Sequence, residues 1–200
     1  MTSAGAIRVH RVLSCVVLGG VVALCVVAYH LGIRNTGYAI GYYHEVFDVG
    51  HPGIVNVVTS MALLSVAVVT VLLGLVTGRR AWYVTAGLFV VLAADNLLRL
   101  HHLMPTGDVT ARLVYWAVFA WLAVRLRPLR HQVPGRVLLL FGIAALVGSE
   151  LMDVAGNDGR GAAAVFEESL GCLGSWALAL AALGMAMSAL VPAALPDPAD

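Results

Sequence analysis

The stretch that decides the fold is AWYVTAGLFVVLAADNLLRLHH, residues 81–102. Up to Ala94 its only polar side chains are those of Tyr83 and Thr85. A helix of about 20 residues, rising 1.5 Å per residue, is long enough to cross the roughly 30 Å hydrocarbon core of a bilayer. The final third nevertheless holds an acid, an amide, an arginine and two histidines. The stretch therefore predicts a membrane-spanning helix with ionisable groups at one end.

The composition extends this prediction to the whole chain. Of its 200 residues, 60% are hydrophobic and only 12% are charged, whereas a soluble domain carries about 25% charged residues. Every basic residue is an arginine, and the formal net charge is +1. We therefore expect an all-α, polytopic transmembrane helix bundle whose main partner is the lipid bilayer. The chain has no basic stripe with interleaved aromatics, so we expect no nucleic-acid partner.

Six apolar runs have the length of membrane spans. They cover residues 12–33, 54–77, 81–102, 109–125, 136–155 and 164–191. The fourth is the shortest, and a five-span arrangement that omits it is the alternative. The first run exceeds the 7–15 residues typical of a signal-peptide core, and no A-x-A cleavage motif follows it, so we interpret it as a retained helix.

The remaining segments add no second domain, so residues 1–200 form a single integral membrane domain. Residues 34–53 are too polar to span a membrane, but they are rich in tyrosine. Aromatic residues favour the membrane–water interface, which predicts an extracytoplasmic loop or an interfacial helix there. Residues 193–200 are predicted to be a short cytoplasmic tail.

The arginines predict the orientation of the bundle. With six spans, eight of them fall on one side: Arg8, Arg11, Arg79, Arg80, Arg125, Arg127, Arg130 and Arg136. Cytoplasmic loops of membrane proteins carry an excess of basic residues, so both termini are predicted to be cytoplasmic. The protein is accordingly expected to be a multi-pass protein of the plasma (cytoplasmic) membrane.

Acidic residues and histidines concentrate on the opposite, outer side. Nine of the eleven acids and five of the seven histidines fall in outer loops or outer helix halves. Acids in outer loops have an ordinary explanation, because they solubilise loops that lack arginine. Acids within spans need a different explanation, since a charged side chain at the centre of a membrane helix raises the free energy of insertion by at least ~2.5–3.5 kcal/mol.

Polar residues recur at helical spacing near the outer ends of four spans. The charged stripes are Asp95, Arg99 and His102 on the third span, Glu150 and Asp153 on the fifth, and Glu167 and Glu168 on the sixth. The uncharged ones are Asn56, Thr59 and Ser60 on the second span, and Cys172 and Ser175 on the sixth. Gly171 and Gly174 share a face with Glu167, which predicts close helix approach, because small residues let membrane helices come together.

If these stripes converge, several carboxylates face Arg99 as their one fixed counter-charge. Crowded, desolvated carboxylates must bind protons or a cation. We therefore predict a divalent-metal site opening outward, and mixed histidine and carboxylate ligation suits Zn, Fe or Mn. The candidate ligands are His101, His102, Asp95, Glu150, Asp153, Glu167 and Glu168. In an enzyme, metal-activated water would attack a lipid-like substrate, with Asp95, Arg99 and Glu150 as candidate catalytic residues.

Other interpretations stay open at this point. The cluster could be a proton or cation relay of a transporter or channel, although the inner halves of the spans look apolar. Asp95 and Arg99 could instead neutralise each other on one helix, with Glu150 and Asp153 reaching the outer surface. A structural or sensor subunit of a membrane complex is a further alternative. Neither the substrate nor the oligomeric state follows from the sequence.

The three cysteines give no motif. Cys15, Cys25 and Cys172 all lie within apolar runs and form no CxxC pair. Neither a disulfide framework nor a thiol redox centre is therefore indicated. We expect these cysteines to be small packing or lipid-facing residues.

Two segments carry a family resemblance: AADNLLRLHH (93–102) and FEESLGCLG (166–174). They resemble paired segments of an uncharacterised family of bacterial six-span membrane proteins with Asp/His and Glu-Glu motifs at helix ends. Asn96 and His102 stand where the family tends to have Glu, which lowers the carboxylate count and adds histidine. The resemblance implies that Asp95, His101, Glu167 and Glu168 act as a set, and it implies no reaction.

Overall fold

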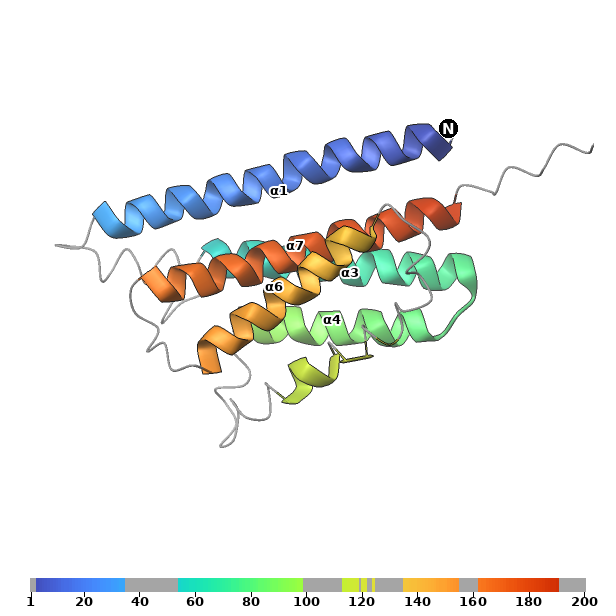
Figure 1. Ribbon diagram of the computed structural model, residues 1–200. Helices are drawn as coiled ribbons and strands as arrows, with labels where there is room; N and C mark the ends of the chain where they lie inside the picture. Colours follow the sequence, from blue (N-terminus) through green and yellow to red (C-terminus); the bar gives the residue numbers. More distant parts are fainter. Residues whose placement is uncertain are drawn as a thin grey trace, which may run out of the picture.

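The computed structural model describes the backbone of residues 3–34, 54–98, 135–154 and 162–190, together with helical residues 113–118, 120–121 and 124. The described elements are helices: α1 (Ser3–Arg34), α3 (Ile54–Thr77), α4 (Ala81–Leu98), α6 (Arg136–Val154) and α7 (Ala162–Leu190) (Figure 1). The all-α class is confirmed for this part of the chain. Of the predicted interfacial segment 34–53, Arg34 is the last residue of α1, and the rest of that segment and the tail 193–200 lie outside the described residues.

Local sequence explains the tight turn between α3 and α4. Gly78 has a φ of 66°, a left-handed conformation that glycine adopts without steric cost, and its N–H lies 2.9 Å from Gly74 O. The Tyr83 ring packs on Gly74, where an added Cβ would lie 2.9 Å from the ring. Three residues therefore suffice to reverse the chain.

α7 is the central helix of the bundle. It packs against α1, α3 and α6, and α3 also packs against α4 (Figure 1). α1 is antiparallel to α7, because His10 near the start of α1 contacts Leu180 near the end of α7. α6 is also antiparallel to α7, since Gly135 lies beside Ala181 and Ser149 beside Glu167.

The residues between 113 and 124 run antiparallel to α4. The Tyr115 hydroxyl donates a hydrogen bond to Asp95, near the end of α4. The Trp121 Nε1–H donates to Thr85 Oγ1 at 3.4 Å, near the start of α4. The chain therefore passes back along α4 after that helix has ended.

Four described helices are long and apolar enough to cross a membrane: Gly5–Val27, Ile54–Thr77, Ala81–Leu98 and Phe166–Leu190. They overlap the first, second, third and sixth predicted spans, although the first begins at Gly5 and ends at Val27 where 12–33 was predicted. α6 is helical over the predicted fifth span. α1 starts at Ser3, so Arg8 and Arg11 lie within its first turns and not ahead of it. Arginine is a good helix former, so the helix continues beyond its apolar stretch.

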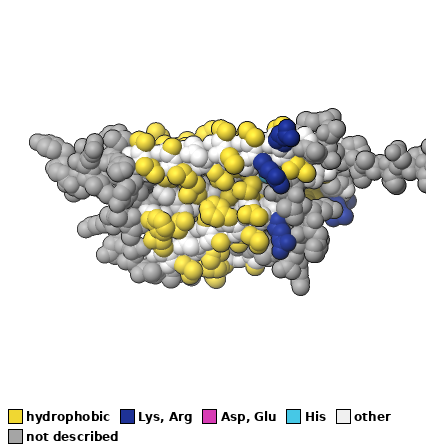
Figure 2. Space-filling model, turned by 45° about the horizontal axis from the view of Figure 1, so that its top comes forward, with side chains coloured by type: hydrophobic (Ala, Val, Ile, Leu, Met, Phe, Trp, Pro, Cys, Tyr) yellow, Lys and Arg dark blue, Asp and Glu magenta, His cyan; other side chains and the backbone are white. Residues whose placement is uncertain are grey.

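The outer surface of the bundle is apolar. Large hydrophobic side chains are exposed along several helices, among them Val12, Val16, Val68, Leu75 and Val91. Figure 2 shows such side chains over the middle of one face, with arginines gathered at one end. Water-soluble monomers rarely expose apolar patches larger than a few hundred Å², whereas lipid contacts favour such a belt. This surface is that of a multi-pass membrane protein.

Small residues bring α6 and α7 into close contact. A Cβ added at Gly142 would lie 2.9 Å from Gly174 O, and one added at Gly174 would lie 2.9 Å from Leu146 Cγ. On the same face of α7, a Cβ at Gly171 would lie 3.3 Å from Ser149 Oγ. The predicted close approach on the Gly171–Gly174 face is thus confirmed.

The helix directions separate the charged residues whose side chains the structure describes, whereas Arg34, the last residue of α1, lies at the opposite end of that helix from Arg8 and Arg11. Five arginines lie at the end where α1, α4 and α6 begin: Arg8, Arg11, Arg79, Arg80 and Arg136. Four acids lie at the other end, where α4 and α6 finish and α7 begins: Asp95, Glu150, Glu167 and Glu168. We call these the arginine end and the acidic end.

Candidate polar site at the acidic end

Asp95 is the centre of the acidic end. Its side chain is only 8% exposed, although α4 is otherwise mostly apolar. The Tyr115 hydroxyl donates a hydrogen bond to Asp95 Oδ2, and the charge of Glu150 on α6 acts on the same phenol. Burying a polar group is costly unless it is hydrogen-bonded, so Tyr115 accounts for part of what keeps Asp95 inside. The Asp95–Tyr115 hydrogen bond therefore joins α4 to the segment that follows it, and Glu150 of α6 is near enough for its charge to act on the phenol.

A polar link between α3 and α4 positions the neighbouring residue. Asn96 Nδ2 donates to Asn56 O and to Ser60 Oγ, both at 2.9 Å. Ser60 Oγ in turn donates to Ala93 O at 3.2 Å. These hydrogen bonds hold the end of α4 against α3. They thereby fix the face of α4 that carries the Asp95 side chain.

A second link joins α6 to α7 beside Glu150. Ser149 Oγ donates to Glu167 O at 3.0 Å, and the absence of a side chain at Gly171 leaves room for this contact. Glu150, Glu167 and Glu168 are all partly exposed. The close glycine contact thus places the end of α6 beside the two acids in the second turn of α7.

The predicted site residues fall into two groups. Asp95, Glu150, Glu167 and Glu168 lie at the same end of the bundle, as their stripes predict. The side chains of four others lie outside the described residues: Arg99, His101, His102 and Asp153. Within the described residues, no group of three or more His, Cys, Asp or Glu side chains is arranged to hold a metal ion. Metal binding with histidine ligands therefore stays a prediction.

The interior between the two ends is packed with apolar side chains in the described helices. Phe89 is 1% exposed and lies in a cluster with Leu63 and Leu178. The hydroxyls of Thr70 and Thr85 donate to carbonyls of their own helices. This packing of the described helices agrees with the apolar inner halves predicted from sequence.

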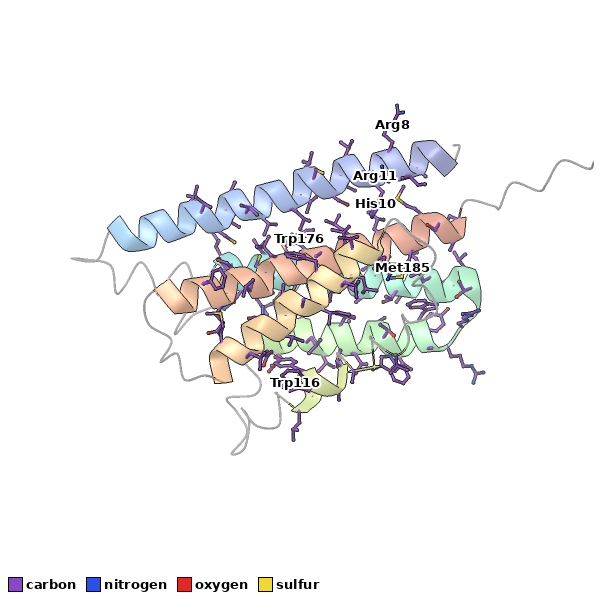
Figure 3. All side chains as sticks on the ribbon, viewed as in Figure 1. Arg8, His10, Arg11, Trp116, Trp176 and Met185 are labelled. Carbon is purple, nitrogen blue, oxygen red and sulfur yellow. The ribbon has the colours of Figure 1, made fainter. Side chains whose placement is uncertain are left out.

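The contacts of Tyr115 and His10 were not predicted from the sequence. Nothing in the local pattern marked Tyr115 as the partner of Asp95, because the two residues are joined only by tertiary packing. His10 was also missed: it is 1% exposed, lies 2.8 Å from Leu180 O through Nε2, and fits against Gly184. Figure 3 shows His10 between α1 and α7. It lies at the arginine end, so it anchors α1 and takes no part in the acidic end.

The chain matches no protein-family model, no curated protein and no solved structure. The resemblance of residues 93–102 and 166–174 to a bacterial six-span family thus stays a prediction, and the chemistry of the acidic end must be argued from its own residues.

Proposed function

We propose that this protein is a six-span integral membrane protein whose acidic end binds a divalent metal ion. The observation that carries the proposal is the position of Asp95, which is buried in an apolar bundle and hydrogen-bonded to Tyr115, a phenol on which the charge of Glu150 also acts. Ionisable residues inside membrane segments are costly and are usually retained for function. Carboxylates gathered at one end of an apolar bundle attract a cation, because the negative charge of each carboxylate makes ionisation of the others more costly.

The direction of the helices supports six spans. α4 and α6 both begin at the arginine end, so the chain between them must return across the bundle. The contacts of Tyr115 and Trp121 with α4 run in that returning direction. An even number of spans, with arginines gathered at the end where α1 begins, supports cytoplasmic termini in a plasma membrane.

Further ligands are available in the sequence next to Asp95 and Glu150. His101 and His102 follow Asp95 by about two helical turns, and Asp153 follows Glu150 by one. Glu167 and Glu168 enter from α7. A set of imidazoles and carboxylates suits Zn, Fe or Mn. The packed interior favours a site served from one side over a path for ions through the membrane.

Such a site would support hydrolysis of a lipid-like substrate in the outer leaflet. A bound metal lowers the pKa of its water to about 7 and so supplies a nucleophile. Glu150 would accept the proton of that water, and Arg99 would bind an anionic headgroup.

Metal analysis of the detergent-purified protein tests the proposal. We expect about one metal ion per chain in the wild type and in Asp197→Asn, which changes a tail carboxylate. Asp95→Asn and Glu150→Gln should each lose most of it. A wild type that binds no metal after incubation with Zn, Fe or Mn salts refutes the proposal. Ion flux in liposomes that depends on Asp95 would replace it with a transport function.

A further inference from the structure

The fold brings together two cysteines that are far apart in the sequence. Cys25 on α1 is 7% exposed and Cys172 on α7 is fully buried, and both belong to one buried cluster with Val21 and Val55. Their side chains lie within reach of each other across the α1–α7 contact. Sequence reasoning treated them as unrelated packing residues, because the local pattern shows no pairing.

Hydroxyl groups surround this thiol pair. The Ser169 hydroxyl hydrogen-bonds to Cys25, and the Thr59 hydroxyl of α3 lies within hydrogen-bonding reach of Cys172. The Thr59 hydroxyl also donates to Val55 O at 2.8 Å, which holds it in place beside Cys172. Each sulfur therefore has a hydroxyl neighbour in addition to the other sulfur, in an otherwise apolar layer.

The contact between the thiols suits a disulfide. A disulfide joins residues whose Cβ atoms are about 3.8 Å apart and whose Cα atoms are about 4.4–6.8 Å apart. Cys25 and Cys172 lie on packed helices within one buried cluster, which is the arrangement such a bond needs. Cys15, by contrast, is exposed on another part of α1 and serves as an internal comparison.

We propose that Cys25 and Cys172 are a redox pair that forms an interhelical disulfide by reducing a lipid-soluble quinone. The two S–H bonds break and one Sγ–Sγ bond forms. The two electrons and two protons pass to the quinone, which becomes a quinol. α1 is then covalently joined to α7, one helical turn beyond Glu168.

The location of the pair selects the oxidant. Both cysteines lie within helices long and apolar enough to span a membrane, Gly5–Val27 and Phe166–Leu190. A charged, water-borne oxidant enters such a layer poorly, whereas a quinone dissolves in it. α1 packs mainly against α7, so the remaining exposure of Cys25 is the route by which the quinone reaches a sulfur. This proposal does not depend on metal binding at the acidic end.

Quinone reduction by the purified protein is the test. Reduced Cys15→Ser protein in detergent is mixed with a short-chain benzoquinone under argon, then denatured and labelled with a maleimide polymer that adds visible mass. We expect two labels per chain before the reaction and none after it, with one quinone consumed per chain. Mass spectrometry should find the peptides of Cys25 and Cys172 joined, and the oxidised protein should melt at a higher temperature.

Two variants in the same background separate pairing from general reactivity. Cys15→Ser/Cys25→Ser and Cys15→Ser/Cys172→Ser should each keep one label after quinone treatment, with no gain in melting temperature. If Cys15→Ser protein keeps both labels with the quinone, the proposal is wrong. The proposal would be wrong even if the general oxidant copper-phenanthroline forms the disulfide. That result would show that the cysteines can pair but that the quinone does not oxidise them.

Discussion

At the scale of single residues, Asp95 shows how a buried acid is kept in an apolar helix. A hydrogen bond from Tyr115, a residue on another segment, offsets part of the cost of burying Asp95. The neighbouring Asn96 is likewise held by atoms of α3. Polar side chains at the acidic end therefore stabilise contacts between helices as well as forming the candidate site.

Tyr115→Phe tests the hydrogen bond to Asp95. The variant removes the donor, so we expect the free energy of unfolding in detergent to fall by about 1 kcal/mol, within the roughly 0.6–2 kcal/mol typical of buried hydrogen bonds in membrane proteins. In an Asp95→Ala background, Tyr115→Phe should lower the free energy of unfolding by a much smaller amount. Equal costs in the two backgrounds would show that the bond contributes nothing. Tyr83→Phe, on a ring packed against Gly74, is the control.

At the scale of elements, glycines decide how closely the helices pack. Gly142 and Gly174 allow α6 to cross α7 at backbone contact, and Gly184 makes room for His10 of α1. In a membrane, apolar side chains gain little by leaving lipid, so close packing and interhelical hydrogen bonds hold helices together. The position of the acidic end depends on these contacts, because they align the ends of α6 and α7.

Gly174→Ala should loosen the α6–α7 contact. The new methyl group would lie 2.9 Å from Leu146 Cγ and 3.0 Å from Gly142 O, so the helices must move apart. We expect a loss of about 1–3 kcal/mol in unfolding free energy, as is typical of overpacking. Gly87→Ala, which meets nothing within 4 Å, should be neutral or slightly stabilising. Chemical unfolding of both variants checks this, and equal stabilities would contradict it.

Gly184→Ala should release the start of α1. Its Cβ would lie 2.7 Å from His10 Nε2, which displaces the imidazole from Leu180 O. We expect limited proteolysis to cut α1 several-fold faster than in the wild type. The control is Gly20→Ala, on α1 itself. The added Cβ meets open space there, so the rate of proteolytic cleavage should stay unchanged. Faster cleavage in both variants would point to a general effect on α1.

At the scale of the whole molecule, the bundle has an apolar belt and two chemically different ends. Successive helices run in opposite directions. The described arginine side chains, which precede or begin α1, α4 and α6, therefore reach one end of the bundle, and the described acidic side chains reach the other end. Basic residues stay on the cytoplasmic side during insertion, so this separation also predicts the orientation.

Site-directed labelling tests that orientation. In a variant with all three native cysteines changed to serine, Arg80→Cys places a thiol at the arginine end while Arg79 keeps a positive charge there. We expect a membrane-impermeant maleimide to label it only after cells are broken open. A second variant, Asp108→Cys, lies in a loop predicted to face outward and should be labelled in intact cells. The reverse pattern would invert the proposed topology.

Much of this fold follows from the sequence alone. Apolar runs of span length, ended by glycine and arginine, predicted α3 and α4 within a few residues, and the Gly171–Gly174 face predicted a close helix approach, for which the structure supplies α6 as the partner. These features are encoded locally, because length, hydropathy and helical periodicity depend on neighbouring residues. The sequence also predicted that Asp95, Glu150 and Glu168 would lie at one end, since helix direction sets depth.

The tertiary structure alone decided which side chains meet. Tyr115 joins Asp95, His10 fits against Gly184, and Cys25 meets Cys172, although none of these pairs shares a local pattern. Depth along a helix is set by sequence, but rotation and partner choice are set by packing between helices that are distant in the chain. The sequence therefore determined the spans and the level of the polar residues, and packing determined the contacts that give those residues their chemistry.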